Sequence, residues 1–164
     1  MEEKDSINKL FNKMGSLARD LSDGFKKLGN IGSDHVLSTL DNIVVKKTQY
    51  TSEKNVENII SNQLEIEYKN QVHQQYGIGG FLHLKIDIDI ADGQVGIELK
   101  LAKELNSSNI ERLLGQVLYY SKRKYKNDLI VLIVGTEKEY DQTIRELKSI
   151  ILEQDVKFYY LNVK

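Results

Sequence analysis

The chain has 164 residues, of which 40% are hydrophobic and 29% are charged. Its 23 Lys and Arg residues are balanced by 24 Asp and Glu residues, so the net charge of −1 favours no nucleic-acid partner and any such site has to be a local basic patch. The absence of Cys excludes a disulfide framework, a thiol nucleophile and a cysteine zinc site. No signal-peptide pattern opens the chain and no apolar run reaches the roughly 20 residues of a membrane span, so we expect a cytoplasmic protein without a membrane partner.

Residues 1–50 are expected to form an N-terminal helical hairpin. From Ile7 to Leu28, apolar residues recur at intervals of three and four, which is the spacing of one helix face. Ser33 or Asp34 can cap a second, shorter helix that carries Val36, Leu37, Leu40, Ile43 and Val44. The long apolar stripe has to be covered by the rest of the chain, by another protein or by a second copy, and we favour a two-fold homodimer.

Residues 51–164 are expected to form an α/β domain in the order α-β-β-β-α-β-α-β. Thr51 or Ser52 caps a helix that ends near Asn70, and strand patterns follow at 72–77, 81–90 and 94–102. Asp92-Gly93 is a strong signal for a two-residue hairpin turn between the second and third strands. A helix at about 107–124, a buried strand at 128–135, a helix to about 154 and a strand at 156–163 complete a central mixed sheet of about five strands, flanked by helices.

Charged residues alternate with apolar ones along the two strands of this predicted hairpin. In the first strand, Ile86, Ile88 and Ile90 point one way, and Lys85, Asp87 and Asp89 point the other way. In the second strand, Glu98 and Lys100 share one face. Pairing of the strands therefore places Asp87 or Asp89 beside Glu98 and Lys100. Two carboxylates can bind Mg²⁺ and a lysine can orient a water molecule, which are the requirements of phosphodiester hydrolysis.

Asp87 followed after ten residues by Glu98-Leu99-Lys100, within this element order, resembles the PD-(D/E)XK nuclease superfamily with its restriction-endonuclease-like fold. The resemblance covers residues 51–164 and implies a DNA nuclease that depends on Mg²⁺ or Mn²⁺. It implies that Asp87 and Glu98 bind the metal, that Leu99 lends its backbone carbonyl and that Lys100 serves the attacking water. The signature proline is absent, since Ile86 precedes Asp87.

Residues on two helices extend the resemblance. Glu57 is similar to the helical glutamate that reaches the metal through water, and Glu53, one turn earlier, is the alternative. Gln116 and Tyr120 resemble a Q-x-x-x-Y feature of the exonuclease-like branch, which adds Gln116 to the catalytic residues. The residues expected to contact the phosphate backbone are Arg112, Gln116, Tyr120, Lys122 and Arg123. For the basic segment 119–126, a cationic helix end that complements the helix dipole is an equally weighted interpretation.

Other interpretations of the charged residues remain open. The carboxylates and the lysine can be the solvated face of a hairpin, with ion pairs worth about 0.2–1 kcal/mol each. A calcium-binding EF-hand loop from Asp87 to Glu98 is excluded, because Ala91 occupies a ligand position and Asp92 stands where the turn requires glycine. The three histidines lack the spacing of a zinc site. The chain can also be a nuclease-fold DNA-binding or assembly subunit without activity, or an interaction protein that acts through its N-terminal helices.

Overall fold

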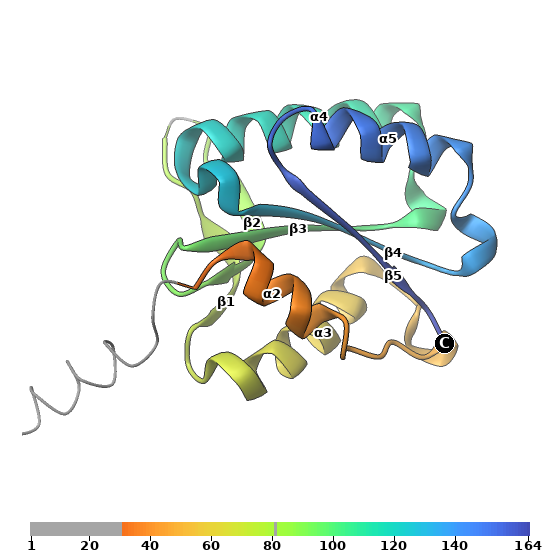
Figure 1. The fold of residues 1–164 in the computed structure, drawn as a ribbon, viewed down its shortest axis with the longest axis horizontal. Coiled ribbons are helices and arrows are strands. Elements are labelled where there is room, and N and C mark those ends of the chain that lie inside the picture. Colours follow the sequence, from red (N-terminus) through yellow and green to blue (C-terminus); the bar gives the residue numbers. More distant parts are fainter. Residues whose placement is uncertain (1–30, 81) are drawn as a thin grey trace, which may run out of the picture. The chain divides into compact units, whose positions relative to one another are not determined.

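A five-stranded mixed sheet forms the centre of the computed structural model, which describes residues 31–80 and 82–164 (Figure 1). The strands are β1 (Val72–Gly77), β2 (Lys85–Ile90), β3 (Val95–Leu101), β4 (Leu129–Gly135) and β5 (Lys157–Asn162), and they lie side by side in chain order. The pairs β1–β2 and β2–β3 are antiparallel, whereas the pairs β3–β4 and β4–β5 are parallel. The predicted α/β class and the mixed sheet are therefore confirmed.

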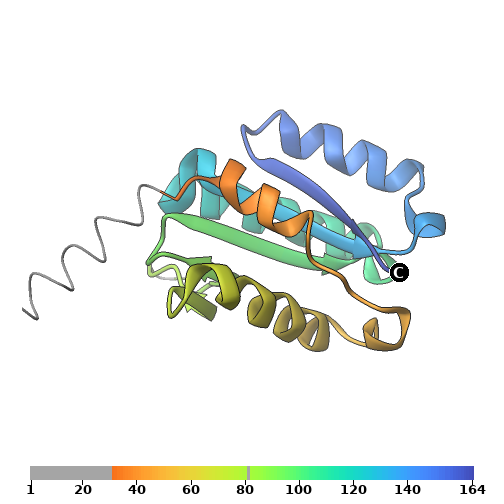
Figure 2. The ribbon, with the colours of Figure 1, turned by 60° about the horizontal axis from the view of Figure 1, so that its bottom comes forward.

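Helices cover both faces of the sheet (Figures 1 and 2). On one face lie α2 (Ser33–Leu40) and α3 (Glu53–Tyr68), and on the other lie α4 (Ser107–Tyr120) and α5 (Gln142–Leu152). From α3 onwards, the elements follow the predicted order α-β-β-β-α-β-α-β. Within the described part of the chain, no helix combines the length and the apolar composition that crossing a membrane requires.

Burial of both sheet faces changes the prediction for β2. A solvated face was one of the open interpretations of its charged residues, but every residue of this strand except Lys85 is buried. The grouping of Ile86 with Ile88 and Ile90 is also wrong, because Ile86 packs in the core cluster that includes Leu113 and Val117 of α4. Ile88, in contrast, pairs with Ile97 of β3. The pairing of β2 with β3 covers only Ile88 to Ile90, so Ile86 lies outside the paired segment and does not follow its alternation.

The turn between β2 and β3 is centred on Asp92-Gly93 as predicted, but four residues separate the last strand pair, Ile90 and Val95. Ala91, Asp92 and Gly93 have positive φ angles of 56°, 51° and 93°, and the backbone N–H of Gln94 donates to the carbonyl of Ala91 at 3.3 Å. Two consecutive positive φ angles are the requirement of the tight hairpin turns that Asp-Gly favours. The turn fixes the register in which Ile90 pairs with Val95, and this register decides which charged residues meet further along the strands.

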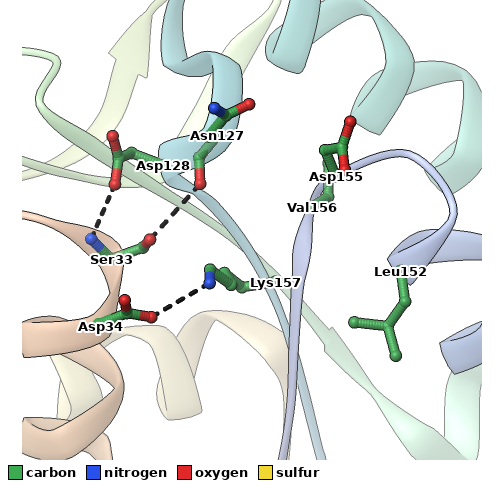
Figure 3. A pocket seen from close by; sticks show the side chains of 8 residues that line it. All are labelled: Ser33, Asp34, Asn127, Asp128, Leu152, Asp155, Val156 and Lys157. Atoms are coloured by element: carbon green, nitrogen blue, oxygen red, sulfur yellow. Dashed lines mark hydrogen bonds and ion pairs between the residues drawn. The ribbon is translucent and has the colours of Figure 1, made fainter.

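Helix α2 is capped differently from the prediction. The chain forms a compact unit from Gly32 onwards, so α2 belongs to the same unit as α3 and the sheet. Gly32 occupies the N-cap position without a side-chain cap, and the Ser33 N–H instead donates to Oδ1 of Asp128 at 2.9 Å (Figure 3). The Ser33 hydroxyl donates to the Asn127 carbonyl, and Asp34 pairs with Lys157 on β5. The first predicted helix of the hairpin lies outside the described residues.

Two helix boundaries differ from the sequence pattern. Thr136 and Glu139 form a capping box, which is a helix-start pattern in the sequence, but it closes a short 3-10 turn, and α5 begins at Gln142 after its N-cap Asp141. Helix α4 ends at Tyr120 and continues as a π-helical turn over Ser121–Tyr125. Such turns shift the side chains that follow them relative to a regular helix. The basic residues after Tyr120 therefore do not continue the α-helical spacing of α4.

Candidate active site

The candidate site lies where β2 and β3 separate. Backbone pairing of the two strands is regular from Ile88 to Ile90 and has ended at Asp87. In place of a strand partner, the N–H of Leu99 donates to Oδ2 of Asp87 at 2.8 Å. The side chain of Asp87 thus enters the gap between the strands, next to the Glu98-Leu99-Lys100 segment of β3.

The ammonium group of Lys100 lies at the centre of the charged side chains. Its Nζ donates to the Leu99 carbonyl oxygen at 2.6 Å and lies 3.0 Å from Oε1 of Glu98. Oδ2 of Asp87 is 3.4 Å away, and Oε1 of Glu53 is 3.2 Å away. Burial lowers the pKa of Lys100, but the charges of the three carboxylates together outweigh burial and raise this pKa above its ordinary value. The amine is therefore protonated at neutral pH.

Glu98 is the most deeply buried carboxylate of this group, with 1% of its surface exposed. Burial raises the pKa of Glu98 to about 8, helped by repulsion from Asp87 and opposed by the attraction of Lys100. Its Oε2 is buried and has no hydrogen-bond partner within the part of the chain that the structure describes. An unsatisfied buried carboxylate oxygen is costly in free energy, and a bound cation is one of the partners that can satisfy it.

Both glutamates that the sequence offered from the preceding helix come close to the site. Glu53 contacts Lys100 directly, and its pKa is raised, chiefly by burial. Glu57 is 2% exposed, and its two carboxylate oxygens are bonded to Lys54 at 2.9 Å and to Gln75 at 3.0 Å. The two glutamates therefore differ in what they contact. Glu53 contacts Lys100, whereas Glu57 is linked to Asp87 through Gln75.

On α4, Gln116 and Tyr120 contact each other, and burial raises the pKa of Tyr120 with help from the charges of Glu98 and Asp87. Nε2 of Gln116 lies 3.2 Å from the Tyr120 hydroxyl, which donates to the Lys85 carbonyl at 2.9 Å. Oε1 of Gln116 is buried without a partner among the described residues. Tyr120 was expected at the nucleic-acid surface, but it is fully buried. The reason is its spacing of three residues from Val117, which places the ring on the apolar face of α4.

The basic residues predicted to contact phosphate lie in two places. Arg112 lines a pocket of about 190 Å³ together with Glu53 and Lys100, so it belongs to the surroundings of the carboxylates. Lys122 and Arg123 are exposed on the π-helical turn after α4. Their contact with nucleic acid stays a prediction.

The position of this pocket agrees with the general location of ligand sites in α/β sheets. Lys100 and Leu101, which line it, lie at the carboxyl end of β3, and ligands bind preferentially at the carboxyl ends of parallel strands. A larger pocket of about 570 Å³, shown in Figure 3, lies instead at the amino ends of β4 and β5, around Asp128 and Lys157. The larger pocket is therefore separate from the place where Asp87, Glu98 and Lys100 meet.

Asp89, the second aspartate of β2, has a different environment from Asp87. It is fully buried, the Tyr125 hydroxyl donates to its Oδ1 at 2.7 Å and the Gly93 N–H donates to its Oδ2 at 3.1 Å. Gly96, opposite Asp89, leaves room for the tyrosine ring, which a Cβ there would meet at 2.7 Å. His73 and Asp92 offer ligand atoms within 4.8 Å of each other and of Asp89, so these three residues are a second group that could hold a metal ion. The hydrogen bonds from Tyr125 and Gly93 give Asp89 a structural role.

A Tyr125→Phe substitution tests this role. It removes the hydroxyl that donates to Oδ1 of Asp89 and leaves a buried carboxylate oxygen without that donor. We expect the free energy of unfolding to fall by about 1–3 kcal/mol. Urea denaturation monitored by circular dichroism measures the change, and a variant as stable as the wild type would contradict the structural role of Asp89.

Sequence reasoning missed Gln75, whose amide contacts both Glu57 and Asp87. Glutamine has no distinctive pattern on a strand, and the neighbouring Gln74 looks equivalent in the sequence. The contact depends on the backbone angle at residue 75 and on the packing of α3 against β1, neither of which sequence spacing shows.

The residues at this site fit a divalent cation. The donors that meet at Lys100 are carboxylate and carbonyl oxygens of Asp87, Glu98 and Leu99, the hard ligands that Mg²⁺ and Mn²⁺ prefer. Glu98 retains one buried oxygen without a partner among the described residues.

Searches of protein-family models, of curated proteins and of solved structures found no match to this chain.

Proposed function

We propose that the chain is a metal-dependent nuclease of the PD-(D/E)XK type that hydrolyses the phosphodiester bonds of DNA. The observation that carries the proposal is the convergence of Asp87, Glu98 and the Leu99 carbonyl on one point, where Lys100 contacts all three within 3.4 Å. The restriction-endonuclease-like arrangement of the sheet is part of the same proposal.

Charge balance argues against a purely structural role for these side chains. Three carboxyl groups contact the buried Lys100, so once Glu98 gives up its proton to a cation the group carries more negative charge than Lys100 neutralises. Buried ion pairs seldom stabilise a fold relative to apolar side chains of the same volume, because desolvation of the charges is costly. An excess of buried negative charge is what a site for a divalent cation requires.

In the proposed mechanism, Asp87, Glu98 and the Leu99 carbonyl oxygen hold one Mg²⁺ or Mn²⁺ ion. The ion, when bound, supplies the positive charge that stabilises the phosphate in the transition state. Lys100 lies beside the same oxygens, so its ammonium can donate a hydrogen bond that orients the attacking water. Glu53 or Glu57 can accept a hydrogen bond from water on the α3 side.

Residues of α4 serve the substrate backbone in this proposal. Arg112 lines the pocket next to Lys100, so its guanidinium can contact a phosphate near the cleaved bond. Gln116 has a buried amide oxygen without a partner in the described structure, and this group is available to a water or a ligand. Lys122 and Arg123 are exposed further along and would hold the strand through charge. The homodimer through residues 1–50 stays a prediction.

The test is a cleavage assay on plasmid, linear and single-stranded DNA with Mg²⁺, Mn²⁺ or EDTA. We expect cleavage in either metal and none in EDTA. A chain that binds DNA in a salt-dependent manner but cuts no substrate in either metal would contradict the nuclease and favour the DNA-binding or assembly subunit. A chain that does neither would leave only an interaction protein.

A further inference from the structure

Gln75 has a backbone conformation that is unusual for its position on a strand. Its neighbours Gln74 and Tyr76 pair with Ile88 and Ile86 of β2, which places Gln75 opposite Asp87. Its φ angle is 52°, in the left-handed region that is unfavourable for residues with a Cβ atom. Strained backbone of this kind persists where the surrounding structure enforces it, and it is concentrated at functional sites.

The side chain of Gln75 joins two carboxylates from different elements. Its Nε2 donates to Oε2 of Glu57 on α3 at 3.0 Å and to Oδ1 of Asp87 on β2 at 3.1 Å. An amide nitrogen has two hydrogens, so these two bonds use its full donor capacity. Gln75 thus holds two like charges close together that would otherwise repel each other.

The orientation of the Asp87 carboxylate follows from this bond. One of its oxygens accepts from the Leu99 N–H and lies near Lys100, and the other accepts from Gln75. With donors on both oxygens, the carboxylate plane is fixed relative to Glu98 before any ligand arrives. We propose that Gln75 is a positioning residue that orients Asp87 for the divalent cation, an inference that rests on the proposed function.

A neutral amide suits this task better than a cationic side chain. A lysine or arginine at position 75 would also donate to Glu57 and Asp87, but its charge would oppose the binding of a divalent cation. Glutamine satisfies the oxygens and leaves their negative charge in place. Removal of a hydrogen bond to a metal ligand typically lowers metal affinity by about 10- to 100-fold.

The experiment measures Mn²⁺ affinity by isothermal titration calorimetry, and melting temperature in EDTA, for the full chain and its variants. Gln75→Gly tolerates the positive φ angle and removes the amide, whereas Gln75→Asn also tolerates this angle but is too short to reach both carboxylates. We expect both variants to bind Mn²⁺ about 10- to 100-fold more weakly, without a matching loss of melting temperature. Gln142→Ala is the control, because the Gln142 amide also donates to a glutamate but on α5.

The outcomes separate this inference from the proposed function. A wild-type chain that binds no Mn²⁺, or a Glu98→Gln variant that binds it as tightly as the wild type, overturns the metal site and the inference together. If the wild type binds Mn²⁺ and Glu98→Gln does not, the site stands. Wild-type affinity in either folded Gln75 variant then overturns the positioning role alone. A melting temperature that falls in step with the affinity would assign Gln75 to the fold instead.

Discussion

A Glu98→Gln substitution is expected to lower kcat/KM for the proposed DNA cleavage by about 10³-fold, because it removes one of the two carboxylates proposed to hold the cation that stabilises charge in the transition state. The chain should stay folded. The raised pKa of about 8 means that the buried Glu98 side chain is largely protonated at neutral pH without metal, and glutamine resembles that neutral form in size and polarity. Initial cleavage rates at saturating Mn²⁺, with circular dichroism spectra of both proteins, measure the effect.

Asp87→Asn and Asp89→Asn form a matched pair that tests the assignment on β2. Both residues are buried aspartates on the same strand. Asp87 meets Lys100, whereas Asp89 is bonded to Tyr125 and Gly93. We expect Asp87→Asn to lose cleavage in the same manner as Glu98→Gln, and Asp89→Asn to lose stability but keep cleavage. The reverse result would show that Asp89, and not Asp87, is the aspartate that cleavage requires.

Without metal, the melting temperature is expected to fall by several degrees as the pH rises from 5 to 8. Glu98 has an ordinary pKa of 4.5, and the folded chain raises it to about 8. Between these values the folded state binds a proton that the unfolded state does not, so stability is highest below the lower value and is lost as pH rises to the upper one. The raised pKa values of Glu53 and Asp89 act in the same direction.

A divalent cation should reverse this loss, since it takes the place of the proton on Glu98. The increase in melting temperature caused by Mn²⁺ is therefore expected to be larger at pH 8 than at pH 5. Scanning calorimetry at pH 5 and pH 8, in EDTA and in millimolar Mn²⁺, measures the pH dependence of the melting temperature and its increase with Mn²⁺. In Glu98→Gln the pH slope should flatten and the Mn²⁺ increment should disappear. A wild-type melting temperature that is independent of pH and of Mn²⁺ would count against a buried, titrating Glu98.

Local signals predicted the part of the site that lies within one hairpin. Asp92-Gly93 sets the turn, the turn sets the register and the register brings Asp87 to Glu98, all within a short stretch of chain. The continuous apolar run of β4 likewise predicted a strand that is buried on both faces, and all seven of its residues are buried.

The remaining features depend on contacts between distant residues, which spacing along the chain does not encode. Asp128 caps α2 from 95 residues away, so the local candidates Ser33 and Asp34 were the wrong choice of cap. Glu53 reaches Lys100 only because α3 packs against β3. The burial of Asp87 and Asp89 follows from the helices on both sides of the sheet, whereas alternation on β2 alone indicated a solvated face.

The capping of α2 has a consequence for the order of folding during synthesis. This helix has eight residues, which is too short to be stable in isolation in water. The groups at its N-terminal end are Asp128, which leaves the ribosome 95 residues after Ser33, and Lys157, which leaves it 123 residues after Asp34. The bonds of His35 and Thr39 to Tyr68 of α3 can form much earlier in synthesis. The helix therefore docks in two stages, and its N-terminal end is held only when β5 has emerged.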